Sequence, residues 1–150
     1  MPDWTIRRLA PGDEAGFTAM LDLFAEAFED PVAYSSRRPG PAWREQLLAS
    51  PDFVALVAEQ GGAVVGALAA YLLRKFEQER CEAYIYDLAV SAAARRQGIA
   101  MGLIEALKPV ARAAGAYVIF VQADREDDPA IALYTRLGRR EDVLHFDIPV

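Results

Sequence analysis

A basic, glycine-containing segment at residues 95–100 has the residue types that bind phosphate groups. It follows an apolar, strand-like run over residues 83–90 and precedes a helix-like run over residues 101–114. The first N–H groups of a helix have no intrahelical acceptor, and the helix dipole favours anions beside them. Gly98 lets the backbone approach a bulky phosphate, while Arg95 and Arg96 add positive charge at the rim. These features predict a diphosphate ligand.

Two well-known phosphate-binding motifs are absent from the sequence. It contains neither a Gly-x-x-x-x-Gly-Lys-Ser/Thr loop nor a Gly-x-Gly-x-x-Gly dinucleotide fingerprint. Residues 95–100 instead resemble the Arg/Gln-x-x-Gly-x-Gly/Ala signature of the GCN5-related N-acetyltransferase (GNAT) superfamily, whose members bind the pyrophosphate of acetyl-coenzyme A. Taken alone, the segment is also explained by a basic turn before an ordinary helix.

A second segment resembles another signature of the same superfamily. Residues 117–121 form an apolar, strand-like run that is followed by the sequence QAD. Residues 127–138, DDPAIALYTRLG, then carry an alanine, a Leu-Tyr pair and a final glycine in the order typical of that signature's helix. Because the two signatures occur in the expected order and at a compatible spacing, the chain is identified from its sequence as similar to the GNAT superfamily.

The resemblance narrows over residues 70–149, which are similar to the type I aminoglycoside 3-N-acetyltransferases. It is carried by KFEQ at residues 75–78, YIYDLAV at 84–90, QAD at 122–124 and LHFDI at 144–148. It implies direct transfer, in a ternary complex, of acetyl from acetyl-coenzyme A to the 3-amino group of a 2-deoxystreptamine antibiotic such as gentamicin, which confers resistance. The alternatives are a GNAT enzyme for a polyamine, a small amine or a protein N-terminus, and a non-catalytic acyl-coenzyme A sensor.

The same resemblance implies an α+β fold with a mostly antiparallel central sheet, flanked by helices, whose fourth and fifth strands are parallel and splayed. Pro109 is expected to kink or break its helix near Lys108. Residues 30–41 are expected to form a loop, and residues 1–150 a single domain. Periodicity and turn residues predict strands over residues 5–9, 53–58, 64–73, 83–90, 117–121 and 143–148, and helices over residues 15–28, 42–48, 101–114 and within 127–138.

The resemblance also implies which residues hold acetyl-coenzyme A. The main chain of the fourth strand is expected to pair with the pantetheine arm, and the basic segment is expected to hold the pyrophosphate. The expected cofactor-binding residues are Leu88, Ala89, Val90, Arg95, Arg96, Gln97, Gly98, Ile99, Ala100, Met101, Asp127 and Tyr134.

Tyr134 and Asp124 are the expected catalytic residues. By resemblance, Tyr134 lies near the thioester sulfur, where its hydroxyl can hydrogen-bond to the departing thiolate; a tyrosine packed in the core is the alternative. Asp124 can hold a substrate ammonium and relay its proton, or can be a turn or capping aspartate. Relatives elsewhere in the superfamily carry a glutamate base that aligns with Tyr84, so the resemblance implies that the base role has moved. Asp128, which precedes Pro129, is expected to be a helix N-cap.

Aromatic and polar residues of the later strands are expected to contact the substrate. Alternation places Tyr84 and Tyr86 on one face of the fourth strand and Asp87 on the other. His145 is expected to be packed or solvent-facing, and Cys81 to be structural. The expected substrate-binding residues are Tyr84, Tyr86, Gln122, Asp124, Asp127 and Asp147.

Composition and charge limit the function classes. With 53% hydrophobic and 25% charged residues and one cysteine, the sequence is typical of a globular protein without an internal disulfide. Its net charge of −6 disfavours nucleic acid and favours a cationic substrate such as an aminoglycoside. No secretory leader or membrane-spanning run is visible, so we expect a cytoplasmic protein with no membrane partner. We expect no metal ion; both a monomer and a homodimer are compatible with the sequence.

Overall fold

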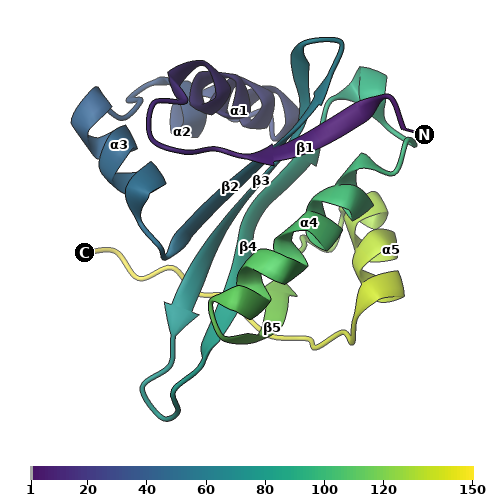
Figure 1. Ribbon diagram of the computed structural model, residues 1–150. Helices are drawn as coiled ribbons and strands as arrows, with labels where there is room; N and C mark the ends of the chain where they lie inside the picture. The colour runs from purple at the N-terminus through teal and green to yellow at the C-terminus, as the bar shows by residue number, and fades with distance from the viewer. Residues whose placement is uncertain (1) are drawn as a thin grey trace.

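The computed structural model describes residues 2–150 and contains a five-stranded sheet with helices on both faces (Figure 1). The strands follow one another in chain order across the sheet: β1 (Trp4–Arg8), β2 (Phe53–Gln60), β3 (Ala63–Arg74), β4 (Cys81–Val90) and β5 (Ala116–Val121). Neighbouring strands are antiparallel from β1 to β4, whereas β4 and β5 are parallel. The expected α+β fold with a mostly antiparallel sheet is therefore confirmed.

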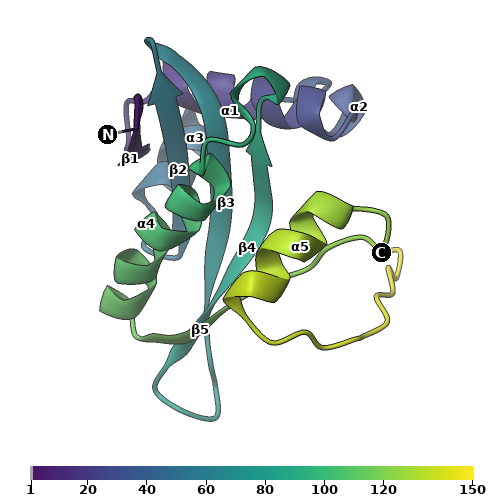
Figure 2. The same ribbon diagram turned by 90° about the vertical axis from the view of Figure 1, so that its right-hand side faces the viewer.

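The helices cover the two faces of this sheet. On one face, α1 packs against β3 and β4, and α4 crosses the opposite face (Figures 1 and 2). A short 3₁₀ turn (Ala92–Ala94) connects β4 to α4. The helices are α1 (Glu14–Ala27), α2 (Pro31–Ser35), α3 (Pro41–Ala49), α4 (Ile99–Ala113) and α5 (Asp128–Leu137).

Apolar side chains form two cores, one on each face of the sheet. On β2, Leu56 packs in the core beneath α4, while the next residue, Val57, packs in the core beneath α1. From α4, Ile99, Leu103 and Leu107 project into the first of these cores and are at most 2% exposed. Burial on both faces explains why β2 and β3 appear in the sequence as nearly continuous apolar runs.

Residues 30–41 contain a helix where the sequence analysis predicted a loop. The carboxylate of Asp30 accepts a hydrogen bond from the N–H of Ala33 at 3.0 Å, and Pro31 occupies the first helical position of α2. An N-capping aspartate followed by proline is a helix-start signal. The loop prediction was wrong because it treated each proline as a breaker, although proline is tolerated in the first turn of a helix.

The helix α4 runs from Ile99 to Ala113 and contains Pro109 without interruption. The break expected near Lys108 does not occur. Pro109 lies on the exposed side of the helix, where the carbonyl that loses its partner can be hydrated. Leu103, Leu107 and Ala111 are buried on the opposite side, and their packing offsets the cost of the missing hydrogen bond.

The segment after α5 is not a strand in this structure. Residues 139–150 have no regular secondary structure and are exposed, so the strand predicted over residues 143–148 was wrong for the isolated chain. In Figure 2 this tail stands clear of the strands of the sheet. Its alternating sequence is nevertheless typical of a strand, because Leu144, Phe146 and Ile148 share one side in an extended conformation. What it lacks is a neighbouring strand.

Within residues 2–150, no helix has the length and apolar character required to cross a bilayer.

Candidate active site

The parallel strands β4 and β5 separate in the middle of the molecule. Their last paired residues are Ile85 and Val121, beyond which β4 continues to Val90 while β5 ends. Within the described part of the chain, the edge of β4 at residues 86–90 therefore has no partner on its β5 side. Its backbone N–H and C=O groups are available to an extended ligand in the way that an added strand would use them.

The basic segment folds as a turn into the N-terminus of α4. Arg96 and Gly98 have positive φ angles of 63° and 77°, and the helix begins at Ile99. The carbonyl of Gly98 accepts a hydrogen bond from the N–H of Gly102 at 2.9 Å, so the N–H groups of the first three helical residues have no intrahelical acceptor. A Cβ atom on Gly98 would meet no heavy atom within 4 Å. The space above the turn is therefore open to a phosphate group.

Residues of β1 and β2 hold this turn in place. The indole N–H of Trp4 donates to the carbonyl of Gln97 at 3.1 Å, and Gln60 Nε2 donates to Gln97 Oε1 at 2.9 Å. Gly102 permits this approach, because a Cβ there would lie 2.5 Å from the Trp4 ring. Gln97 was expected to bind cofactor; its side chain is turned toward β2, which leaves its backbone N–H for a ligand. Sequence reasoning missed Trp4 and Gln60.

We expect the substitution Trp4→Phe to weaken coenzyme A binding about threefold to tenfold, which corresponds to the loss of one hydrogen bond worth about 0.5–1.5 kcal/mol. Phenylalanine keeps an aromatic ring on β1 but lacks the Cη2 and Cζ3 atoms of the indole that lie over Gly102, so part of that packing is lost while the pairing of β1 with β2 is retained. Titration calorimetry measures the Kd, and a thermal melt serves as the folding control. An unchanged Kd would mean that the Trp4 contact does not position the turn.

Tyr134 lies on α5 and is partly buried against the same core cluster as Leu88, Val90 and Ile99. The cluster thus joins the open edge of β4, the start of α4 and the helix that carries Tyr134. Burial, together with the charge of Asp127, raises the pKa of Tyr134 to about 12. Its hydroxyl is therefore a neutral hydrogen-bond donor near neutral pH.

Asp127, rather than Asp128, caps α5. The carboxylate of Asp127 accepts a hydrogen bond from the N–H of Ala130 at 3.2 Å, and the helix begins at Asp128. The predicted N-cap was one residue too late, because Pro129 occupies the second rather than the first helical position. The cap engages one carboxylate oxygen of Asp127; a contact from this residue to cofactor or substrate stays a prediction.

The strand β5 ends at Val121, so Gln122 and Asp124 lie in the loop beyond it. The Tyr84 hydroxyl donates to Gln122 Oε1 at 2.9 Å, which brings together two of the expected substrate-binding residues. Asp124 is exposed. The turn that follows uses its backbone carbonyl, which accepts a hydrogen bond from the N–H of Asp127 at 3.0 Å. The capping role considered for Asp124 therefore belongs to Asp127.

A β-bulge turns Asp87 toward the same face of the sheet as Tyr84. The register between β3 and β4 shifts between Ala69 and Ala70, which leaves Tyr86 as an extra residue on β4. A bulge of one residue reverses the alternation beyond it. The expectation that Asp87 faces away from Tyr84 was therefore wrong, because it assumed a regular strand.

Asp87 is a partly buried carboxylate that sequence reasoning did not select. The hydroxyl of Tyr34, on α2, donates to Asp87 Oδ2 at 2.7 Å. Burial raises the pKa of Asp87, and the hydrogen bond from Tyr34 partly offsets that rise. A carboxylate with a raised pKa beside an open strand edge is typical of a functional site. Neither the bulge nor the contact with Tyr34 has a local signal in the sequence.

Aromatic rings line the sheet beside Asp87. The ring of Tyr84 stacks on Phe120 with a centroid distance of 4.5 Å and an interplanar angle of 6°. Tyr86 contacts Tyr84 and Tyr71 edge to face, at 5.7 Å and 5.8 Å. Aromatic faces attract ammonium groups. The arrangement, which includes the predicted residues Tyr84 and Tyr86, can therefore receive a cationic ligand.

Two other residues considered in the sequence analysis, Asp147 and Cys81, do not take part in this region. Asp147 lies in the exposed tail, where its carboxylate is 2.9 Å from His145 Nε2, and this chain does not bring it to the other substrate candidates. Cys81 is 2% exposed, its thiol lies 3.4 Å from the carbonyl of Ala114, and burial raises its pKa. A buried thiol of raised pKa is a poor nucleophile, as expected for a structural cysteine.

The profile of the acetyltransferase (GNAT) family matches residues 17–138. The chain belongs to this family, and with it to the acyl-coenzyme A-dependent N-acetyltransferases. Members of the family use acetyl-coenzyme A as the acetyl donor, and the open edge of β4 and the turn at Gly98 fit such a ligand.

Two solved structures of aminoglycoside acetyltransferases are similar to this chain over nearly its whole length. An aminoglycoside acetyltransferase from an uncultured soil metagenomic sample is 56% identical, with a TM-score of 0.95 and 98% of each chain covered. Another such enzyme, also from an uncultured soil metagenomic sample and in complex with sisomicin, is 33% identical, with a TM-score of 0.89 and coverage of 99% of this chain and 97% of that chain. No curated protein sequence matches the chain.

Proposed function

We propose that the protein transfers acetyl from acetyl-coenzyme A to the 3-amino group of 2-deoxystreptamine aminoglycosides such as gentamicin, and thereby confers resistance to them. The observation that carries the proposal is the surface formed by Tyr84, Tyr86, Gln122 and Asp87 beside the open edge of β4. The two similar aminoglycoside acetyltransferases and the net charge of −6 support it. The 3-position rests on the resemblance of residues 70–149 to the type I enzymes.

The residues that would hold the cofactor come from two parts of the chain. The backbone at Leu88, Ala89 and Val90 would pair with the pantetheine arm, since this edge has no β5 partner among the described residues. The N–H groups at the start of α4 and the guanidinium groups of Arg95 and Arg96 would bind the pyrophosphate. Acetyl-coenzyme A supplies the acetyl thioester that the reaction consumes.

Carboxylates would accept the proton of the substrate amine, and aromatic rings would bind the ammonium groups of the substrate. We assign Asp124 as the base that accepts a proton from the substrate ammonium, because it is exposed beside Gln122 and does not serve as a helix cap. Asp87 is the second candidate, since burial raises its pKa toward the range useful for proton transfer. The rings of Tyr84 and Tyr86 would hold other ammonium groups of the same substrate.

Tyr134 would donate a hydrogen bond to the departing thiolate rather than give up its proton. A thiol has a pKa of about 8.5 and each pKa unit is worth about 1.36 kcal/mol. With the pKa of Tyr134 at about 12, complete proton transfer would be about 5 kcal/mol uphill. A hydrogen bond stabilises the developing charge without that cost.

The experiment that tests the proposal combines a rate with a product structure. Purified protein is incubated with acetyl-coenzyme A and gentamicin or sisomicin, free thiol is followed over time, and the product is mapped by NMR. We expect thiol release and acetylation of the 3-amino group. Acetylation at another amino group would overturn the 3-position while retaining the substrate class. A strong preference for spermidine or for a peptide N-terminus would overturn the substrate class itself.

A further inference from the structure

Tyr34 joins the short helix α2 to the open edge of β4. Its hydroxyl donates to Asp87 Oδ2 at 2.7 Å, across 53 positions of the chain. Among residues 2–150, no second donor reaches the Asp87 carboxylate, yet neither of its oxygens is a buried atom left without a partner. Solvent therefore reaches Oδ1. The protein holds one oxygen of Asp87 and leaves the other free for a cation.

The surroundings of Tyr34 fix the position of its hydroxyl. The Tyr34 ring packs against Phe24 and Phe28, with both centroid distances at 5.8 Å. Its backbone carbonyl accepts a hydrogen bond from Arg38 Nε at 3.0 Å. The helix that carries it is capped by Asp30. A side chain that packing holds in this way can fix the orientation of a carboxylate bonded to it.

The Tyr34 hydroxyl also favours the ionised form of Asp87. Burial raises the pKa of Asp87, and the hydrogen bond from Tyr34 lowers it. Burial and the bond to Asp87 raise the pKa of Tyr34 itself, so it remains a protonated donor. The other titratable groups around this pair are Tyr71 on β3, Tyr84 and Tyr86 on β4, and Asp30 at the start of α2. The tyrosines are uncharged near neutral pH, and a second carboxylate can only raise the pKa of Asp87. The hydrogen bond from Tyr34 is therefore what offsets the effect of burial.

We propose that Tyr34 is a positioning residue for the acceptor substrate: it holds Asp87 so that Oδ1 binds one ammonium group of the aminoglycoside beside the open edge of β4. The role rests on the proposed function, and Tyr34 acts in it only through Asp87. Residues 31–35, which form α2, thereby become part of the acceptor site although they lie far from β4 in the sequence.

The first test needs no substrate. The side-chain carboxyl carbons of aspartate and glutamate are isotopically labelled, and NMR follows their titration in the native protein and in Tyr34→Phe. The signal of Asp87 is assigned by its absence from Asp87→Asn. A hydrogen bond to the ionised form lowers a pKa, so its loss should move the titration of Asp87 to higher pH. An unmoved titration would overturn the proposal.

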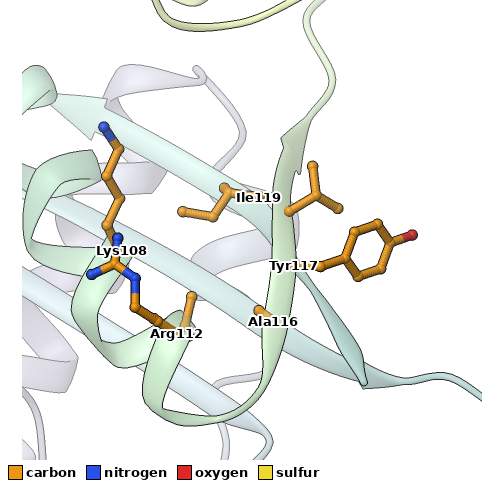
Figure 3. A pocket seen from close by; sticks show the side chains of 7 residues that line it. Lys108, Arg112, Ala116, Tyr117 and Ile119 are labelled. Atoms are coloured by element: carbon orange, nitrogen blue, oxygen red, sulfur yellow. The ribbon is translucent and has the colours of Figure 1, made fainter. Parts of the chain in front are cut away.

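Tyr117→Phe is the matched control, because the Tyr117 hydroxyl also donates to a carboxylate, that of Glu82. This bond lowers the pKa of Glu82. Figure 3 shows the Tyr117 ring on β5, directed away from Lys108 and from the cavity beside α4. The control should move the titration of Glu82 to higher pH and leave that of Asp87 unchanged.

Phe28→Leu separates the hydroxyl from the packing of its ring. It removes one of the two rings against Tyr34 but retains the hydroxyl. We expect the titration of Asp87 to stay near its native position. If Phe28→Leu moves it as far as Tyr34→Phe does, the packing of α2 rather than the hydrogen bond controls Asp87, and the proposal is wrong.

The second test is steady-state kinetics with gentamicin. At neutral pH, Tyr34→Phe should raise the KM for gentamicin about threefold to tenfold, as expected for the loss of one hydrogen bond, and should change kcat less. In a protein that already carries Asp87→Asn, the same substitution should have no further effect, because Tyr34 acts through Asp87. An unchanged KM, or an equal effect with and without Asp87, would overturn the proposal.

The two tests also distinguish this proposal from the proposed function. If the native protein acetylates no aminoglycoside, the proposed function is wrong, whatever the NMR titration shows. If it acetylates gentamicin normally and Tyr34→Phe alters neither the titration of Asp87 nor the KM, only the role of Tyr34 is wrong.

Discussion

Replacing Tyr134 with Phe will lower kcat by about 10²-fold, the loss typical for one donor that stabilises a developing negative charge. The ring is retained, so its packing against the core cluster that includes Ile99 and Leu103 should persist and the Kd for coenzyme A should stay within about twofold. Steady-state kinetics give kcat, and calorimetry gives the Kd. The two readouts together distinguish a residue that acts on the leaving thiolate from one that only fills the core.

Tyr117→Phe is the matched control for this prediction. The Tyr117 hydroxyl donates to Glu82 on the surface, at a distance of 2.5 Å, and lies on β5 rather than on α5. Its loss should leave kcat nearly unchanged. If Tyr134→Phe has the same small effect as this control, Tyr134 is a packing residue and the leaving thiolate is stabilised elsewhere.

The pH dependence of the native enzyme provides a further check on the state of Tyr134. Burial raises its pKa to about 12, so the hydroxyl remains protonated throughout the range in which the enzyme can be assayed. We expect no decline of kcat from ionisation of Tyr134 below about pH 10, because only about one in a hundred Tyr134 hydroxyls is ionised at that pH. A decline with an apparent pKa near 9 that disappears in Tyr134→Phe would contradict the assignment.

Asp124→Asn will lower kcat by about 10²-fold to 10⁴-fold if its carboxylate accepts the proton of the substrate amine, which is the range found for general bases. The fold should be unaffected, because the turn at this position uses the backbone carbonyl of Asp124. Asp128→Asn is the control, since it removes a neighbouring exposed carboxylate without altering the cap made by Asp127. It should change kcat little.

The substitution Asp87→Asn distinguishes Asp87 from Asp124 as the general base. As an ammonium-binding residue, Asp87 would mainly affect KM, whereas as the base it would lower kcat and remove the acidic limb of the pH profile. Because burial raises the pKa of Asp87, that limb would lie above the range of an ordinary aspartate. A larger loss of kcat in Asp87→Asn than in Asp124→Asn would transfer the role of base to Asp87.

The parts of the site that the sequence could predict are those encoded by neighbouring residues. The strand, turn and helix around Gly98 are contiguous, and each has its own propensity, so the order strand–turn–helix and the free N–H groups follow from local rules. The helix of Tyr134 could be predicted for the same reason. Its exact N-cap could not, because both Asp127 and Asp128 are suitable caps and the position of Pro129 in the first turn decides between them.

The parts that could not be predicted depend on contacts between distant residues or on irregular backbone. Trp4 and Gln97 are 93 positions apart, and nothing near either residue indicates their hydrogen bond. The bulge at Tyr86 changes the direction of Asp87, yet a bulge is set by pairing across β3 rather than by local sequence. The tail has the alternation of a strand, but a strand forms only where another strand can pair with it.

The measurement that tests the account most directly is the calorimetric titration of coenzyme A into the native protein and into Gly98→Val. Gly98 has a φ of 77° and open space above it, so valine would strain the turn and place its side chain where a phosphate should lie. We expect one coenzyme A per chain for the native protein, and binding weakened by at least about 30-fold in the variant, which corresponds to about 2 kcal/mol. No binding to the well-folded native protein, or equal binding to both proteins, would contradict the account.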